Sequence, residues 1–230
     1  MAEGMKPYYQ DESVTIYNAD CRDVLPTLDK VDLVLTDPPY GVALGTQYNA
    51  KETRRGVGLV KQAYMSYEDT YEQFIEIVVP AVVDSLKLSD RGMVFCAWQN
   101  IWDFPRADVV SAIHLPAGQG LNRWGRTNLA TLLLYGTAPD LNLGAKNTVL
   151  RSTAHAEPSE HPCPKPLAWV RWAVALGSRT GETVLDPFMG SGTTLRAAKD
   201  RSRKAIGIEI EERYCEIAAN RMSQLVMELN

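Results

Sequence analysis

The chain has 230 residues, a formal net charge of −4 and a hydrophobic content of 45%. Its length suits one large domain with a sizeable core, and its slightly acidic balance argues against a protein that coats itself in nucleic acid. No apolar run is long enough to span a membrane and the first residues lack the apolar core of a signal peptide, so we expect a cytoplasmic protein without membrane contact. Its 4 cysteines are widely spaced without a CxxC pair, which favours reduced thiols over disulfides or a zinc site.

The first part of the chain predicts two strands of a parallel sheet. Residues 13–18 alternate between apolar and polar side chains, and residues 31–36 form an apolar run that stops at Asp37-Pro38-Pro39-Tyr40. A short helical segment over residues 21–28 joins them, which is typical of a right-handed crossover. Because each proline fixes φ and removes a backbone N–H, the second strand must end in a rigid turn.

The next stretch predicts a long inserted loop, a helix and a buried strand. Residues 41–66 contain glycines and basic side chains without periodicity, and a loop this long within a compact domain is usually functional or disordered. A helix then runs towards Lys87, and Pro80 should kink or split it. The strand follows over residues 92–98.

Residues 99–160 are predicted to be a second insertion, which serves as a short target-recognition region. Two strands, over 109–115 and 129–135, indicate an antiparallel hairpin added to a parallel sheet. The stretch 139–164, rich in Pro, Asn and Ser, is expected to run over the surface.

The last part alternates regularly between helices and strands. Pro166 begins a helix, residues 183–185 form a strand, and a glycine-bearing segment over 186–194 precedes a further helix, a strand ending at Glu209 and a final amphipathic helix. About seven strands alternating with helices predict a single α/β domain over 1–230. It is doubly wound, with a mostly parallel Rossmann-like sheet and one antiparallel hairpin.

The glycine-bearing segment favours a cofactor that contains a nucleoside. Its G-x-G spacing, at Gly190 and Gly192, lacks the third glycine of a dinucleotide fingerprint and the lysine of a phosphate loop. It lies between a strand and a helix, where backbone amides favour an anion. Glu209 ends the next strand, where an acid can accept hydrogen bonds from ribose hydroxyls.

Two motifs in this order resemble the amino-group DNA methyltransferase family. They are Asp37-Pro38-Pro39-Tyr40 and the later Asp186-Pro187-Phe188-Met189-Gly190-Ser191-Gly192-Thr193-Thr194, an order similar to the permuted beta class. The segment His161-Pro162-Cys163-Pro164-Lys165-Pro166 and the helix bearing Arg213, Tyr214, Ala218 and Arg221 resemble further parts of that family. The resemblance covers roughly residues 13–100 and 160–225. It implies methylation of the exocyclic amine of adenine or cytosine in DNA with S-adenosylmethionine as cofactor.

The resemblance also implies which residues hold the cofactor. The residues that would hold its methionine end are Asp186, Phe188, Gly190, Gly192, Thr193 and Thr194, with Lys165 supporting that region. Glu209 would take the ribose, and Asp20 would accept a hydrogen bond from the amine of the cofactor's adenine. Asp20 is also placed to cap the helical segment that follows it.

Chemistry at the first motif would begin from a poorly nucleophilic amine whose lone pair is delocalised into the base. The Asp37 carboxylate and the Pro38 carbonyl would each accept one N–H, which localises the lone pair for direct in-line displacement. Tyr40 would stack on the base, which must leave the duplex, and Pro39 would keep the turn rigid. No covalent intermediate is required. In the family, Asp at the first position is commoner with adenine and Ser with cytosine, so we favour adenine N6 over cytosine N4.

The part of the chain left for reading a DNA target is short, since two sheet strands already fall between residues 98 and 161. The basic residues chosen as DNA contacts are Lys51, Arg54, Arg55, Arg123 and Arg126, and solvated surface charge is the alternative interpretation. This predicts short or relaxed specificity, or help from a second subunit in a homodimer. The competing functions are methylation of an RNA or small-molecule amine, and a catalytically silent nucleoside-binding subunit. A dehydrogenase is the weakest, because the third glycine is missing.

Overall fold

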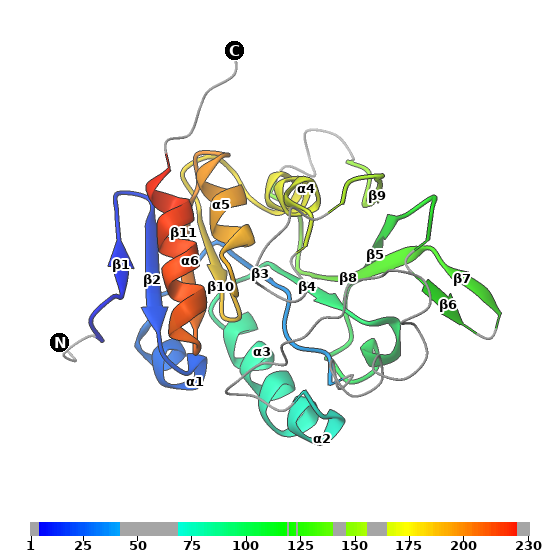
Figure 1. Cartoon of the computed structure of the whole chain (residues 1–230), viewed down its shortest axis with the longest axis horizontal. Coiled ribbons are helices and arrows are strands. Elements are labelled where there is room, and N and C mark those ends of the chain that lie inside the picture. Colours follow the sequence, from blue (N-terminus) through cyan, green and yellow to red (C-terminus); the bar gives the residue numbers. More distant parts are fainter. Residues whose placement is uncertain are drawn as a thin grey trace, which may run out of the picture.

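A computed structural model gives the fold, and the structure describes residues 5–41, 69–118, 120–122, 124–139, 146–155 and 165–224. One nine-stranded sheet forms the centre of the molecule (Figure 1). Its strands, in spatial order, are β1 (Tyr9–Gln10), β2 (Val14–Asn18), β11 (Lys204–Glu209), β10 (Thr183–Asp186), β3 (Leu33–Thr36), β4 (Gly92–Cys96), β8 (Leu129–Tyr135), β5 (Val109–His114) and β9 (Val149–Arg151). A separate two-stranded ribbon pairs β6 (Gly120–Asn122) with β7 (Gly125–Thr127).

The middle of the sheet is parallel and has antiparallel pairs on both sides, while the pair at one border, β5–β9, is again parallel. The five strands β2, β11, β10, β3 and β4 pair in parallel, whereas β8 runs antiparallel to both β4 and β5. In β3 and β4 every residue is buried, which explains their continuous apolar runs, because a parallel strand is covered on both faces.

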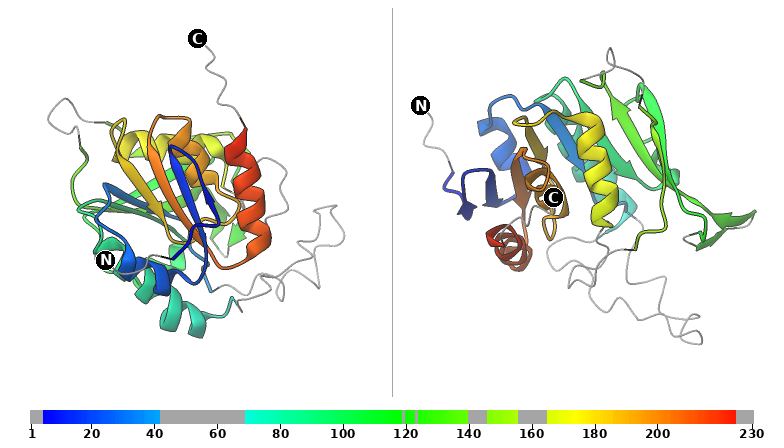
Figure 2. Two further views of the ribbon diagram at one scale, coloured as in Figure 1. Left: turned by 90° about the vertical axis from the view of Figure 1, so that its left-hand side faces the viewer. Right: turned by 90° about the horizontal axis from the view of Figure 1, so that it is seen from above.

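Helices cover both faces of this sheet (Figure 1 and Figure 2). On one face α4 (Leu167–Gly177), α5 (Thr193–Lys199) and α6 (Glu212–Ser223) pack in the largest buried cluster with Leu33, Phe95 and Val184. On the other face the short α1 (Cys21–Val24) and α3 (Val79–Leu86) pack against Val34 and Leu185. Two apolar layers therefore fix the sheet between helices. No helix of the described residues is long and apolar enough to cross a membrane.

The predicted doubly wound α/β fold with an antiparallel hairpin is confirmed, with differences in detail. The sheet has nine strands instead of about seven, because β1 and β9 are added at its edges. Strand β9 lies within residues 139–164, which were predicted to run over the surface without a strand, and it is a mostly exposed edge strand. The first two predicted strands, β2 and β3, are not neighbours, because β11 and β10 lie between them.

The helix before β4 is not split at Pro80, because it stays helical from Tyr71 to Leu86, but it changes from α to π winding just before the proline. It starts at the N-cap Thr70, whose hydroxyl accepts from the Gln73 N–H, and proceeds through α2 (Tyr71–Gln73), the π-helical segment η2 (Phe74–Val78) and α3. Pro80 is the second residue of α3 and follows the π-helical segment, so the irregular winding lies directly before the residue that cannot donate a helix hydrogen bond. Two 3-10 turns, η1 (Leu25–Thr27) and η3 (Trp98–Asn100), complete the described helical elements.

The strand order places a topological switch point between β10 and β3. From β10 the chain continues through α5 to β11 on one side, whereas from β3 it continues through α3 to β4 on the other side and the opposite face. Loops that leave a parallel sheet in opposite directions open a crevice at the carboxyl ends of their strands. Asp37 follows β3 and Asp186 ends β10, so both carboxylates lie at this crevice.

Candidate active site

The crevice is a cavity of about 890 Å³ at the carboxyl ends of β2, β11, β10, β3 and β4. Its lining includes all four residues of the Asp37–Tyr40 turn, Asp20, Glu209 and the glycine-bearing segment except Gly192. These residues were predicted to form two adjacent sites, and the fold brings them into one space. The cavity then extends past Trp98 and Trp169 to Leu129 and the base of the β6–β7 ribbon. A volume of this size suits a nucleoside-containing ligand.

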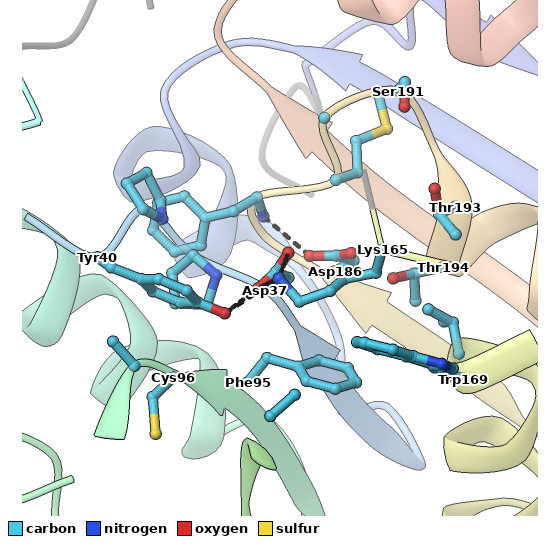
Figure 3. Close-up of a pocket in the computed structure, with 18 of the residues that line it drawn as sticks. Asp37, Tyr40, Phe95, Cys96, Lys165, Trp169, Asp186, Ser191, Thr193 and Thr194 are labelled. Carbon is cyan, nitrogen blue, oxygen red and sulfur yellow. Dashed lines mark hydrogen bonds and ion pairs between the residues drawn. The ribbon is translucent and has the colours of Figure 1, made fainter. Parts of the chain in front are cut away.

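Asp37 is held by two neighbours at the end of β3. The Tyr40 hydroxyl donates to Asp37 Oδ1 at 2.5 Å, and Lys165 Nζ lies 2.6 Å from each of the two carboxylate oxygens (Figure 3). Lys165 Nζ also lies 3.1 Å from the Tyr40 hydroxyl and 5.2 Å from the centre of the Tyr40 ring. The sequence assigned Lys165 to the cofactor region, whereas the structure pairs it with the expected catalytic carboxylate.

Asp186 is a buried carboxyl group that fixes the neighbouring loops. It is 2% exposed and accepts from the Thr36 hydroxyl at 2.8 Å and from the Phe188 N–H at 3.1 Å. Burial raises the pKa of Asp186 to about 6, against the lowering effect of hydrogen bonds from Thr194, Thr36 and the Phe188 N–H. The charge of Asp37 also raises it. These contacts tie the end of β10 to the end of β3, so Asp186 supports the shape of the site.

The glycine-bearing loop follows Asp186 and turns sharply. Gly190 has φ +50° and Gly192 has φ +79°. Both values lie in the left-handed region, which residues other than glycine adopt only with backbone strain. A Cβ on Gly192 would also lie 2.9 Å from the Cβ of Ala218 on α6. The Gly190 N–H donates to Glu209 Oε2 at 3.0 Å, which connects the loop to the end of β11. Both glycines are therefore required by the backbone path.

The hydroxyl groups of the two threonines at the start of α5 differ in whether they can donate a hydrogen bond to a ligand. The Thr194 side chain is hydrogen-bonded to Asp186, whereas Thr193 Oγ1 accepts from the Arg221 guanidinium at 3.3 Å. A hydroxyl has one hydrogen to donate. Since Asp186 takes that of Thr194, the Thr193 hydroxyl is the better placed of the two to donate to an anion in the cavity.

Glu209 and Asp20, at the far end of the cavity, already have local partners. Glu209 accepts from the Gly190 and Glu211 N–H groups, and burial raises its pKa to about 7. Asp20 caps α1 by accepting from the Arg22 N–H, as expected, and its carboxylate also pairs with the Arg22 guanidinium at 2.5 Å. That hydrogen bond lowers the pKa of Asp20. Both carboxyls line the cavity, and Glu209 keeps lone pairs for a further donor, whereas both Asp20 oxygens already accept from Arg22 and would have to share these sites.

Two aromatic walls of the cavity, Phe95 and Trp169, were not selected from the sequence, unlike Tyr40 and Phe188. Phe95 on β4 and Trp169 on α4 line the cavity beside Asp37, and the Trp169 indole N–H donates to Ser152 Oγ at 2.9 Å. Burial raises the pKa of the adjacent Cys96 thiol to about 12, so this cysteine stays protonated and is no nucleophile.

The predicted DNA contacts are only partly within the described structure. Lys51, Arg54, Arg55 and Arg123 lie outside the described residues. Arg126 lies exposed on β7, and its guanidinium donates to the Ala117 carbonyl at 3.4 Å. Trp124, between β6 and β7, is 99% exposed and was not among the predicted DNA contacts.

Known proteins resemble this chain in sequence and in fold. A family model described as DNA methylase matches residues 98–220. Type II methyltransferase M.ScaI of Streptomyces caespitosus is 24% identical over 94% of this chain and 84% of its own length. The crystal structure of the M1.HpyAVI-SAM complex aligns with a TM-score of 0.65 and 21% identity, over 92% of this chain and 100% of that chain. PvuII DNA methyltransferase (cytosine-N4-specific) aligns with a TM-score of 0.62 and 18% identity, over 99% of this chain and 92% of that chain. These two structures share its fold.

Proposed function

This chain belongs to the DNA methylase family of N6 and N4 amino-methyltransferases, and from that premise we propose that it methylates the N6 amine of adenine in DNA. The supporting observation is the convergence of the two sequence motifs. Asp37 and the glycine-bearing loop are far apart in the chain, yet they line one cavity at the switch point of the sheet. An amine acceptor and a cofactor loop on one cavity are what direct methyl transfer requires.

The cavity fits S-adenosylmethionine by the chemistry of its lining. That cofactor supplies an electrophilic methyl group on a sulfonium sulfur, together with a nucleoside and a charged amino-acid end. Glu209 offers carboxylate oxygens for the ribose hydroxyls, and Asp20 offers them for the adenine amine. Gly190 lets the loop backbone approach the ligand, and the Thr193 hydroxyl offers a donor to the carboxylate. Phe188 and Lys165 contribute further surface to the cavity wall.

The turn after β3 would activate the target amine. Asp37 and the Pro38 carbonyl are two fixed acceptors, and each would hold one N–H of the amine so that its lone pair faces the methyl group. Positive charge that develops on nitrogen is stabilised by the Asp37 carboxylate. The Tyr40 and Phe95 rings and the half-exposed Trp98 provide faces on which a base taken out of the duplex can stack. Pro39 keeps the turn from flexing.

DNA would approach the open end of the cavity beside the β6–β7 ribbon. Residues at the base of this ribbon line the cavity, including Gly118 and Thr127, and the ribbon projects beyond the sheet in Figure 1 and in the right view of Figure 2. Trp124 at its tip is suited to stack on an unpaired base, and Arg126 is suited to contact phosphate. We propose these two as DNA contacts, together with Lys51, Arg54, Arg55 and Arg123.

Adenine is preferred to cytosine because Asp is the first residue of the turn motif. The test is transfer of labelled methyl groups to duplex DNA, single-stranded DNA and RNA in parallel. It is followed by modification-sensitive sequencing of DNA from a methylation-free host that expresses the chain. N6-methyladenine in a fixed sequence context is the expected product. Detection of N4-methylcytosine instead would mean that cytosine, and not adenine, is the target base. Methyl transfer to RNA alone, or to none of the three substrates, would overturn the proposal.

A further inference from the structure

Lys165 occupies the position that the target amine needs. Its Nζ lies 2.6 Å from both Asp37 oxygens, and the side chains of this pair are 17% and 26% exposed. The rings of Tyr40 and Phe95 also lie near the ammonium, with their centres 5.2 and 5.6 Å from Nζ. The Lys165 ammonium therefore contacts both oxygens of the Asp37 carboxylate and lies close to two aromatic rings.

This pairing opposes the chemistry expected at Asp37. A bidentate ammonium occupies the outward lone pairs of the carboxylate and cancels its charge. A nitrogen that becomes positive during methyl transfer would then face a neutralised acceptor and a neighbouring cation. Lys165 must therefore leave Asp37 before the carboxylate can hold an amine N–H with its full negative charge.

The cavity also provides a reason for Lys165 to leave. Arg22 and Lys165 are the only Lys or Arg residues among the described residues that line it. Arg22 is paired with Asp20 at 2.5 Å, beside the expected adenine site. The carboxylate at the amino-acid end of S-adenosylmethionine would lie by the glycine-bearing loop, where Lys165 is the available cation. The Asp37 carboxylate and the cofactor carboxylate would therefore compete for the Lys165 ammonium.

We propose that Lys165 is a positioning residue that alternates between Asp37 and the carboxylate of the bound cofactor. Without cofactor it blocks the amine acceptor, and with cofactor it turns away and frees Asp37. Cofactor must then bind before the target base can be held productively. This inference rests on the proposed function, since it takes S-adenosylmethionine as the ligand.

The test measures binding of S-adenosylhomocysteine by calorimetry, without DNA and without methyl transfer. In Asp37→Asn the ammonium has no ion pair to break, so the affinity should rise about tenfold relative to the unsubstituted chain. In Lys165→Met the affinity should fall about tenfold, and the double variant should bind like Lys165→Met because the gain from Asp37→Asn needs the lysine. Decarboxylated S-adenosylhomocysteine, which lacks only the carboxylate, should bind all four chains equally.

Controls separate this device from a merely structural ion pair. Lys199 pairs with Asp11 at the same 2.6 Å but does not line the cavity, so Lys199→Met should leave the affinity unchanged. Lys165→Arg retains the charge and should restore most of the binding lost in Lys165→Met. Equal affinities in Asp37→Asn and the unsubstituted chain, or a gain in Asp37→Asn that survives Lys165→Met, would overturn the inference while leaving the proposed function standing. Failure of the unsubstituted chain to bind S-adenosylhomocysteine would overturn both.

Discussion

The two ends of the cavity are built in different ways. At the end formed by β10, β11 and β3, the polar side chains are fixed by one another and by backbone groups, as the contacts of Asp186 and Glu209 show. At the end formed by β5, β8 and the β6–β7 ribbon, exposed apolar side chains such as Trp124 and Leu129 face solvent. The first end is organised before any ligand arrives, whereas the second presents surface that a large partner can cover.

The largest effect should come from the organised end, at Asp37. Replacing it by alanine in Asp37→Ala removes the fixed acceptor for the amine, so methyl transfer should fall by a factor of about 10³ or more. Binding of S-adenosylhomocysteine should persist, and it should tighten as in Asp37→Asn, since Asp37→Ala also removes the ion pair with Lys165. Labelled methyl transfer and calorimetry measure the two quantities.

A matched variant tests whether this loss belongs to the site. Asp84 forms an exposed ion pair with Lys87 on the outer surface, and Asp84→Ala should keep normal turnover. Near-normal turnover in Asp37→Ala would contradict the mechanism. It would also mean that the fixed polar groups at the organised end of the cavity are not what makes methyl transfer possible.

The second effect concerns the stability of the glycine-bearing loop. Gly192→Ala places a Cβ in left-handed backbone at φ +79° and 2.9 Å from Ala218 Cβ, so the free energy of unfolding should drop by about 2–3 kcal/mol. Gly181→Ala is the control, because Gly181 has a similar φ of +83° but no atom within 4 Å of the added Cβ. It should lose only the backbone part, about 1–2 kcal/mol. Denaturant unfolding measures both losses. Equal losses would show that the contact between the loop and α6 is not tight.

The sequence predicted the organised end far better than the open one, for a physical reason. Asp37, Asp186 and Glu209 each end an apolar strand, and the carboxyl ends of parallel strands share one edge, so local motifs were enough to bring them together. What local patterns could not predict was the partner of each group. Lys165 pairs with Asp37, 128 positions away, through a contact that only the folded chain creates.

At the open end the sequence carried a weaker signal. The antiparallel pair β5 and β8 was predicted as a hairpin, but the ribbon between its strands is short, and an exposed tryptophan has no periodicity to mark it. Strand β9 has only three residues and pairs with a strand distant in sequence. Such pairings are fixed by tertiary packing and not by local propensity.

The third effect tests the open end directly. Removing the exposed ring in Trp124→Ala should weaken binding of duplex DNA by about 2 kcal/mol, or roughly 30-fold, because one base–aromatic stack is lost. Binding of S-adenosylhomocysteine should not change. The control is Trp102→Ala, since Trp102 is also 81% exposed but does not line the cavity or belong to the ribbon. Fluorescence anisotropy with labelled duplex at fixed salt measures the affinity. Equal DNA binding in the two variants would remove the ribbon from the proposed interface.

The smallest effect is a pH dependence at the organised end. Glu209 has a pKa raised to about 7 by burial, so much of this carboxyl is protonated at pH 6 and ionised at pH 8. The ionised form is the better acceptor for ribose hydroxyls. Affinity for S-adenosylhomocysteine should therefore rise up to about tenfold between pH 6 and pH 8. Glu209→Gln, which cannot ionise, should lose the part of this rise centred near pH 7.

Stability of the ligand-free chain should change in the opposite direction over an overlapping range. The folded chain holds a proton on Glu209 that the unfolded chain releases near the ordinary pKa of 4.5, so the folded state binds more protons. The stabilisation is complete below that value and is lost as pH rises towards about 7. Asp186, with a pKa of about 6, should also lower the stability of the folded chain as pH rises, but over a lower pH range than Glu209 does. This second loss of stability should remain in Glu209→Gln. Unfolding measured at several pH values separates the two. If affinity for S-adenosylhomocysteine rises with pH while the stability of the ligand-free chain falls, the ionised Glu209 carboxylate is a buried charge. Its cost to the folded chain is then offset only when the ligand binds.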